Sequence, residues 1–173
     1  HTANLIHDDV VDGSTSRRGK ESVHRKWDNA HGVLVGDFVY SKAFQLMASL
    51  KNSQIIKILA NSTNIISEGE ILQLSLKSKE LISEDDYFEI IGRKTAELFK
   101  ASSRSAAVLS EASHEEVESA GDFAYSLGIA FQIQDDLLDY FGNEKVTGKK
   151  IGKDFLEGKT TLPLLRAIKL ASE

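Results

Sequence analysis

Two aspartate triads of the form DDxxD carry the most chemically suggestive spacing in the chain. They comprise Asp8, Asp9 and Asp12 in HDDVVD, and Asp135, Asp136 and Asp139 in QIQDDLLD. On a helix the first and last aspartates of a triad share one face, and the middle one is turned by about 100°. Carboxylates gathered in this way repel one another, so a cation is their natural counter-charge. All-oxygen ligands without a His/Cys cluster favour Mg²⁺, with phosphate oxygens and water completing its shell.

A solvated acidic helix face is the usual explanation of a single triad of this kind. Both triads, however, lie among apolar residues, such as Ile6 and Val10 around the first and Ile133 and Leu137 around the second. The second also falls near the C-terminal end of an expected helix, where negative charge opposes the helix dipole unless a cation binds. No EF-hand spacing is present. The sequence therefore predicts that both triads bind metal and, through it, a diphosphate.

Basic residues follow each triad. Arg17 and Arg18 come shortly after the first, and arginine forks bind phosphate oxygens in a bidentate manner. A glycine-rich segment after the second triad could fold over a bound diphosphate, and its lysines include Lys149, Lys150, Lys153 and Lys159. Lys94 and Thr95 stand among apolar residues in the middle of an expected helix, where a lysine points either to water or to an anion.

The composition narrows the possible functions. The chain has 173 residues, 41% of them hydrophobic, and a net charge of -5, which argues against a nucleic-acid binder. There are no cysteines, so disulfides and thiolate-held zinc are excluded. No apolar run reaches the roughly 20 residues that span a membrane. The chain begins at His1 inside a helical pattern and ends inside another, so we expect an internal part of a longer protein, with residues 1–173 forming one partial catalytic domain.

Long helices must position these residues, because the sequence has one proline and few turn clusters. The residue pattern predicts helices over 1–11, 23–27, 33–50 and 53–76, a fifth starting at Ser83, a sixth from Ser113 to Phe141, and a last one from about Thr160. Loops are expected in GSTSRRGKES and in GNEKVTGKKIGKDFLEGK. The fold class is all-α, without a convincing strand.

Together these motifs resemble the trans-isoprenyl diphosphate synthases, and in particular the long-chain polyprenyl type. The resemblance runs along the chain through HTANLIHDDVVD, STSRRGKESVH, GVLVGDFVYSKAF, EGEILQL, GRKTAELFKAS, GIAFQIQDDLLDYFG and TGKKIGKDFLEGKTTLPLL. It implies an isoprenoid synthase-type helical bundle around a deep apolar cavity, here without its N- and C-terminal helices. It also implies a prenyltransferase that condenses isopentenyl diphosphate with an allylic diphosphate, using about three Mg²⁺ ions held by triads that face each other.

The resemblance also assigns roles to residues. It makes Asp8, Asp12, Lys94 and Asp135 catalytic, with all six triad aspartates as metal ligands. Arg17 would contact the allylic diphosphate and Arg18 that of isopentenyl diphosphate. The other substrate-binding residues would be Lys94, Thr95, Gln132, Lys149 and Lys159, with Lys150 as an alternative to Lys149.

Product length is expected to depend on Ala3. This residue lies five positions before Asp8, one turn further down the same helical face. In short-chain members that position is often aromatic and stops the growing tail. Alanine, with a first triad that lacks a two-residue insertion, favours a long product, such as a quinone side-chain precursor.

Three other functions stay open at this point. An HD-type metal phosphohydrolase would use the His7–Asp8 doublet, but needs further histidines and leaves the second triad unexplained. A non-catalytic prenyl synthase subunit usually lacks the aspartates, and a terpene cyclase usually lacks the paired arginines.

The resemblance further implies a homodimer, product delivery to a membrane without a transmembrane segment, and a bacterial cytoplasmic location, or the mitochondrial matrix in a eukaryote.

Overall fold

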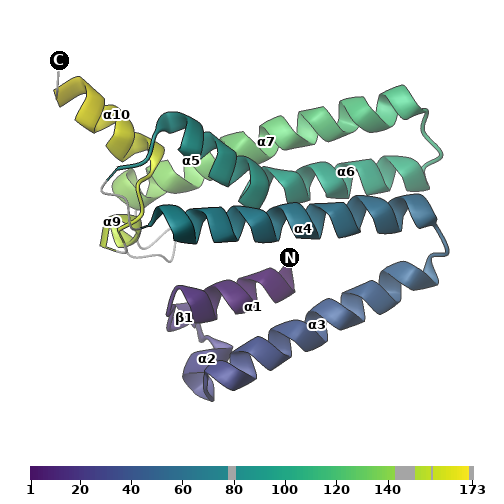
Figure 1. Ribbon diagram of the computed structural model, residues 1–173, viewed down its shortest axis with the longest axis horizontal. Helices are drawn as coiled ribbons and strands as arrows, with labels where there is room; N and C mark the ends of the chain where they lie inside the picture. Colours follow the sequence, from purple (N-terminus) through teal and green to yellow (C-terminus); the bar gives the residue numbers. More distant parts are fainter. Residues whose placement is uncertain (78–80, 143–150, 157, 172–173) are drawn as a thin grey trace. The chain divides into compact units, whose positions relative to one another are not determined.

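The computed structural model describes residues 1–77, 81–142, 151–156 and 158–171. The chain forms two compact units, His1–Ile56 and Lys57–Glu173, and each is described by itself (Figure 1). The expectation of one catalytic domain over residues 1–173 stays a prediction. In the described part of the chain, no helix has the length and hydropathy to cross a membrane.

The first unit packs helix α1 (Thr2–Val11) against the longer α3 (Asn29–Ser49), with α2 (Val23–Lys26) beside both. A short hairpin of β1 (Ser16–Arg17) and β2 (Lys20–Glu21) links α1 to α2. Two glycines allow α1 to approach α3 closely: a Cβ on Gly36 would overlap the ring of His7, and one on Gly32 would lie 2.5 Å from a methyl carbon of Val10. The His7 ring also hydrogen-bonds the Val33 carbonyl at 3.1 Å.

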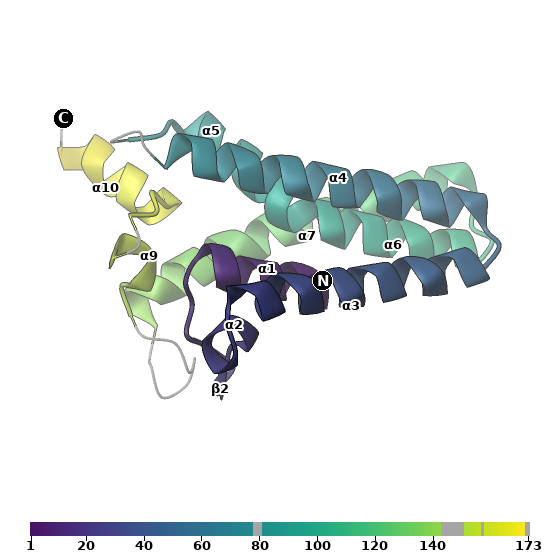
Figure 2. The same cartoon turned by 60° about the horizontal axis from the view of Figure 1, so that its bottom comes forward.

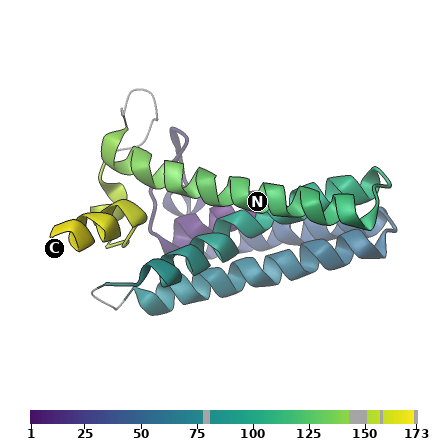
Figure 3. The same cartoon turned by 90° about the horizontal axis from the view of Figure 1, so that it is seen from above.

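The second unit contains most of α4 (Ser53–Leu76), then α5 (Glu84–Ile91), the π-helical turn η1 (Gly92–Ala96) and α6 (Glu97–Leu109). The long α7 (His114–Phe141), the short α9 (Lys153–Leu156) and α10 (Leu162–Ala171) follow. Helices α6 and α7 run side by side along their length (Figure 2). Figure 3 shows the same pairing from above.

A glycine and an alanine allow α7 to pack closely against η1, the π-helical turn that precedes α6. A Cβ on Gly128 of α7 would lie 2.6 Å from the Cα atom of Ala96 in η1. At the end of the unit that holds the second triad, a small core forms around Tyr87, Ile91 and Leu165, with partly buried apolar neighbours Ile82, Ile129, Ile133 and Leu162. This core joins α5, α7 and α10.

The all-α expectation is confirmed, with local differences from the predicted elements. The loop after α1 contains the two-stranded hairpin. Helix α3 begins at Asn29 and not near Val33, because the Asp28 carboxylate caps it by accepting from the His31 N–H at 2.8 Å. The fifth expected helix is interrupted by η1, and the glycine- and lysine-rich segment includes α9.

Candidate active site

The first triad occupies the C-terminal part of α1. Asp9 is buried, with 5% of its surface exposed, whereas Asp8 and Asp12 are partly exposed. Arg17 grips the buried carboxylate, because its Nε donates to Asp9 Oδ1 at 2.9 Å and its Nη2 lies 2.7 Å from the same oxygen. The hydrogen bond to Asp9 raises the pKa of Arg17, to which the charges of Asp8 and Asp12 also contribute. Asp9 therefore fixes the position of the Arg17 side chain. Asp8 and Asp12 remain partly exposed on α1.

The hairpin brings Arg17 to this position. Its turn is Arg18-Gly19, and both residues have positive φ, 52° and 75°. Positive φ at both central residues defines the type I′ turn, whose twist matches a two-stranded hairpin. Gly19 adopts this conformation without cost, but Arg18 does not. The turn thus places two consecutive arginines at the hairpin tip beyond the first triad, with Arg17 directed inwards to Asp9.

The second triad lies near the end of α7 and repeats the burial pattern. Asp136 is 3% exposed, whereas Asp135 and Asp139 are partly exposed. Tyr87 donates its hydroxyl to Asp136 Oδ2 at 2.6 Å, and the Gln132 amide donates to Oδ1 at 2.8 Å. Burial raises the pKa of Asp136, while these two hydrogen bonds oppose the rise. Burial also raises the pKa of Tyr87, so its hydroxyl keeps the proton that it donates.

Thr95 completes this network from the π-helical turn. Its hydroxyl donates to Gln132 Oε1 at 2.8 Å. An ionised Asp136 can only accept, so the amide nitrogen of Gln132 must face it, and the amide oxygen must face Thr95. The donor and the acceptor are therefore determined in both hydrogen bonds, the one from Thr95 to Gln132 and the one from Gln132 to Asp136. Both predicted substrate-binding residues, Thr95 and Gln132, therefore belong to the support of the second triad.

Lys94 lies next to Thr95 in the same turn. Its ammonium group contacts Glu70 Oε2 at 2.8 Å and Gln73 Oε1 at 3.0 Å, both on α4. π-helical turns are rare and often occur at functional sites, because the extra residue redirects the side chains around it. The sequence did not distinguish between water and an anion as the partner of this lysine. In the structure that partner is a carboxylate.

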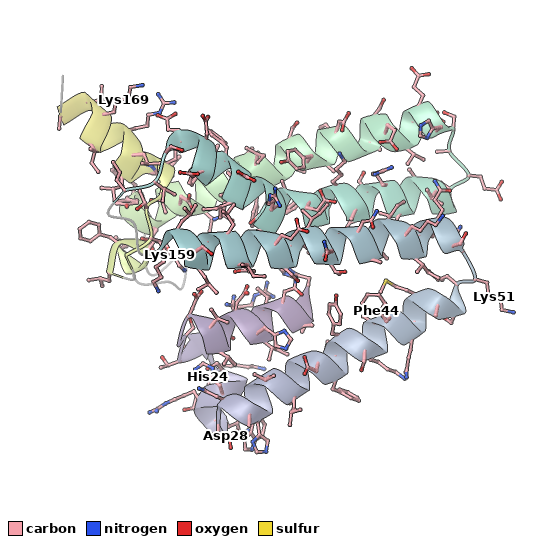
Figure 4. All side chains as sticks on the ribbon, in the orientation of Figure 1. His24, Asp28, Phe44, Lys51, Lys159 and Lys169 are labelled. Carbon is pink, nitrogen blue, oxygen red and sulfur yellow. The ribbon has the colours of Figure 1, made fainter. Side chains whose placement is uncertain are left out.

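Asp139 connects the second triad to the segment that follows it. Its side chain accepts from the Asp154 N–H at 3.1 Å, and its carbonyl accepts from the Gly152 N–H at 2.8 Å. The Lys159 ammonium lies 3.8 Å from Asp154, near α9 (Figure 4). Lys159 is thus brought to the same end of α7 as the triad. Lys149 and Lys150 lie outside the described residues.

The donor set fits magnesium. In the described residues no three carboxylate or imidazole groups converge on one point. Each triad instead offers two partly exposed carboxylates on one helix face. Mg²⁺ is usually held by one or two carboxylates, with water and phosphate oxygens as its remaining ligands. The middle aspartates suit this role less, since Asp9 and Asp136 are buried whereas the outer aspartates are partly exposed.

Some of these hydrogen-bond partners are not indicated by the residue pattern. Tyr87 lies in none of the quoted motifs. Glu70 and Gln73 lie in EGEILQL, but the resemblance assigned no role to either residue. Ala3 is buried, with 5% of its surface exposed. Its proposed role in product length is not tested by this burial.

The polyprenyl synthetase family matches the whole chain, residues 1–173. The chain belongs to this family. It is 48% identical to a polyprenyl synthase from Caulobacter crescentus CB15, whose crystal structure contains calcium and isoprenyl diphosphate, and it superposes on that structure with a TM-score of 0.95 over 99% of this chain and 52% of the other.

Two other members of the family are nearly as similar. A decaprenyl diphosphate synthase from Rhodobacter capsulatus is 45% identical with a TM-score of 0.91, over 100% of this chain and 53% of the other. The octaprenyl diphosphate synthase of Escherichia coli K12 is 45% identical over 97% of this chain and 52% of its own length. The chain spans about half the length of the curated relatives that it matches. The helical isoprenoid synthase fold expected from the motifs is confirmed.

Proposed function

We propose that this chain is the catalytic part of a magnesium-dependent prenyltransferase, which condenses isopentenyl diphosphate with an allylic diphosphate to give a long-chain all-trans polyprenyl diphosphate. The observation that carries the proposal is the arrangement shared by both triads: a buried, hydrogen-bonded middle aspartate between two partly exposed ones. Relatives named as octaprenyl and decaprenyl diphosphate synthases support the reaction class. The small side chain of Ala3, one turn from Asp8 on the same helix, supports a long product.

In this proposal the residues of the chain bind and orient the allylic diphosphate. Bound Mg²⁺ would supply the positive charge that stabilises the departing diphosphate. Asp8 and Asp12 would hold it at the first triad, and Asp135 and Asp139 at the second. Arg18, Lys159 and, after exchanging partners, Lys94 would add charge-assisted hydrogen bonds to phosphate oxygens.

The reaction needs no protein nucleophile. The allylic carbon–oxygen bond breaks, and the electron pair leaves with the diphosphate. The double bond of isopentenyl diphosphate then forms the new carbon–carbon bond, and a proton is lost to the released diphosphate. The fixed oxygens of Thr95 and Gln132 would stabilise the transient allylic cation, while apolar walls keep water away from it.

The alternatives have less support. An HD-type phosphohydrolase needs His7 as a metal ligand, but the His7 Nε2 atom lies 3.1 Å from the Val33 carbonyl and 3.3 Å from Asp37. A non-catalytic subunit would not require both triads with their supports. We further propose a homodimer, a role in quinone side-chain synthesis, and a cytoplasmic enzyme that delivers its product to a membrane.

The direct test is to incubate the full-length protein with farnesyl diphosphate, labelled isopentenyl diphosphate and Mg²⁺, and to measure the chain length of the extracted products. Elongation to a long polyprenyl diphosphate is expected, and EDTA should stop it. Release of phosphate from other esters without elongation would favour the phosphohydrolase. A cyclic hydrocarbon formed without isopentenyl diphosphate would favour a terpene cyclase.

A further inference from the structure

Tyr87 is held rigidly against the second triad, although it belongs to none of the motifs described above. It lies on α5 with 3% of its surface exposed, and its ring packs with Ile91 and Leu165. The 2.6 Å separation from Asp136 Oδ2 falls in the range of charge-assisted O–H···O⁻ bonds. The packed ring has little freedom to move, so the position of its hydroxyl is set by the core of the second unit.

The other oxygen of Asp136 is fixed as well. It accepts from Gln132, and Gln132 is in turn held by Thr95. Donors from α5, from α7 itself and, through Gln132, from η1 therefore determine the orientation of this one carboxylate. Rotating it towards its neighbours would break two hydrogen bonds and leave buried donors without partners, which is costly.

This fixed carboxylate has consequences for the rest of the triad. Asp135 precedes Asp136 directly and Asp139 follows it by three residues, so anchoring Asp136 sets the rotation of the last turns of α7. We propose that Tyr87 is a positioning residue of the second triad: it holds Asp136 inwards, so that Asp135 and Asp139 present their carboxylates to a cation. This inference rests on the proposed function, because it takes the second triad to be a metal site.

The first triad has the same arrangement, which supports a positioning role for groups that bind the middle aspartate. Its middle residue, Asp9, is also buried and also gripped from another element, by Arg17 of the hairpin. The donor differs, a cation in one triad and neutral groups in the other, but the anchored position is the same. Groups outside the metal shell that orient its ligands commonly change metal affinity by about 10- to 100-fold when removed.

The test is Mn²⁺ binding to the full-length protein with inorganic pyrophosphate, followed by electron paramagnetic resonance of the free ion. Tyr87→Phe removes only the hydroxyl and should weaken Mn²⁺ binding by about 10-fold. Tyr125→Phe, the same change at a part-buried tyrosine of this unit, should leave Mn²⁺ binding unchanged. Asp135→Asn marks the loss expected when a ligand is removed. The melting temperature separates this effect from a merely structural one, which would lower stability without changing Mn²⁺ affinity.

Two results distinguish the possible failures. If Tyr87→Phe binds Mn²⁺ like the wild type while Asp135→Asn does not, the positioning role is wrong and the metal site stands. If Asp135→Asn also binds like the wild type, the metal role of the second triad fails, and the inference falls with it. Should circular dichroism show Tyr87→Phe to be unfolded, Gln132→Met removes the donor to the other oxygen. It should weaken binding in the same direction, and unchanged binding would equally contradict the proposal.

Discussion

At the scale of single residues, the middle aspartate of each triad differs from its two neighbours. Asp9 and Asp136 are buried and hydrogen-bonded within the protein, whereas the outer aspartates keep part of their surface exposed. Arg17 serves the fold as well as the site, because its removal would leave the Asp9 carboxylate buried without its ion pair. Loss of activity on replacing Arg17 therefore requires a stability measurement before it is attributed to substrate binding.

Arg18 combines a predicted substrate contact with an unfavourable backbone conformation. Its φ of 52° costs a residue with a long side chain about 1 kcal/mol, and asparagine adopts this region more readily. We expect Arg18→Asn to increase the free energy of unfolding by roughly 0.5–1 kcal/mol, measured in urea, while it raises the KM for isopentenyl diphosphate. Lys20→Asn, in the adjacent strand, serves as the control. Equal stability of the two variants would contradict the strain at Arg18.

The sequence could predict some of this arrangement. The spacing of Asp8 and Asp12 on one helical face follows from the helical period alone, and it is observed. The burial of Asp9 and Asp136 does not follow, because it depends on partners brought by the fold: Arg17 from a hairpin, and Tyr87 from a helix 49 residues away in sequence. The sequence spacing alone therefore does not show that the middle aspartate of each triad is the buried one.

At the scale of elements, the π-helical turn η1 directs Lys94 and Thr95 to different partners, Glu70 and Gln132. Apolar periodicity predicted one uninterrupted helix here, since a single inserted residue hardly disturbs the pattern over a long window. The hairpin was missed for a similar reason, because each of its strands has two residues, too few to alternate visibly. By contrast, the helix starts at Ser83 and Ser113 were predicted correctly, because each is set by a capping box of local residues.

The fit between α7 and η1 provides a test with a matched control. A Cβ on Gly128 would meet the backbone of Ala96 at 2.6 Å, so Gly128→Ala must force the two elements apart. We expect a loss of about 1–3 kcal/mol in the free energy of unfolding. In Gly121→Ala the new methyl meets only side-chain carbons, those of Arg104 at 2.8 and 2.9 Å and one of Lys100 at 3.5 Å, and these can move. Urea unfolding should place this variant within about 1 kcal/mol of the wild type. Equal losses would contradict the close packing.

The capping box of α7 should make stability depend on pH. The Ser113 hydroxyl and backbone N–H hold the Glu116 carboxylate and lower its pKa below the ordinary value. A lowered pKa stabilises the fold above the pKa of the unfolded chain, about 4.3, and this contribution disappears as the pH falls through the folded value. We expect wild type and Glu116→Gln to differ in unfolding free energy above about pH 5 and to converge at lower pH. A constant difference would contradict the assignment.

At the scale of the whole molecule, each compact unit contains one triad and supports it with its own residues. Arg17 and its hairpin belong to the first unit, and Tyr87, Gln132 and Thr95 to the second. The local geometry of each triad is therefore determined within its unit. The polyprenyl synthetase family match spans residues 1–173 and so includes both triads.

The most direct test of the metal-binding role of the triads is the elongation rate of the full-length protein after single replacements of outer aspartates. Asp8→Asn and Asp135→Asn should each reduce kcat with farnesyl and isopentenyl diphosphates by about 100-fold or more, with the melting temperature close to that of the wild type. Asp122→Asn, an exposed aspartate on α7, is the control of equal charge change and should elongate normally. Elongation by Asp8→Asn or Asp135→Asn at the rate of this control would contradict the assignment of the triads as the metal-binding centre.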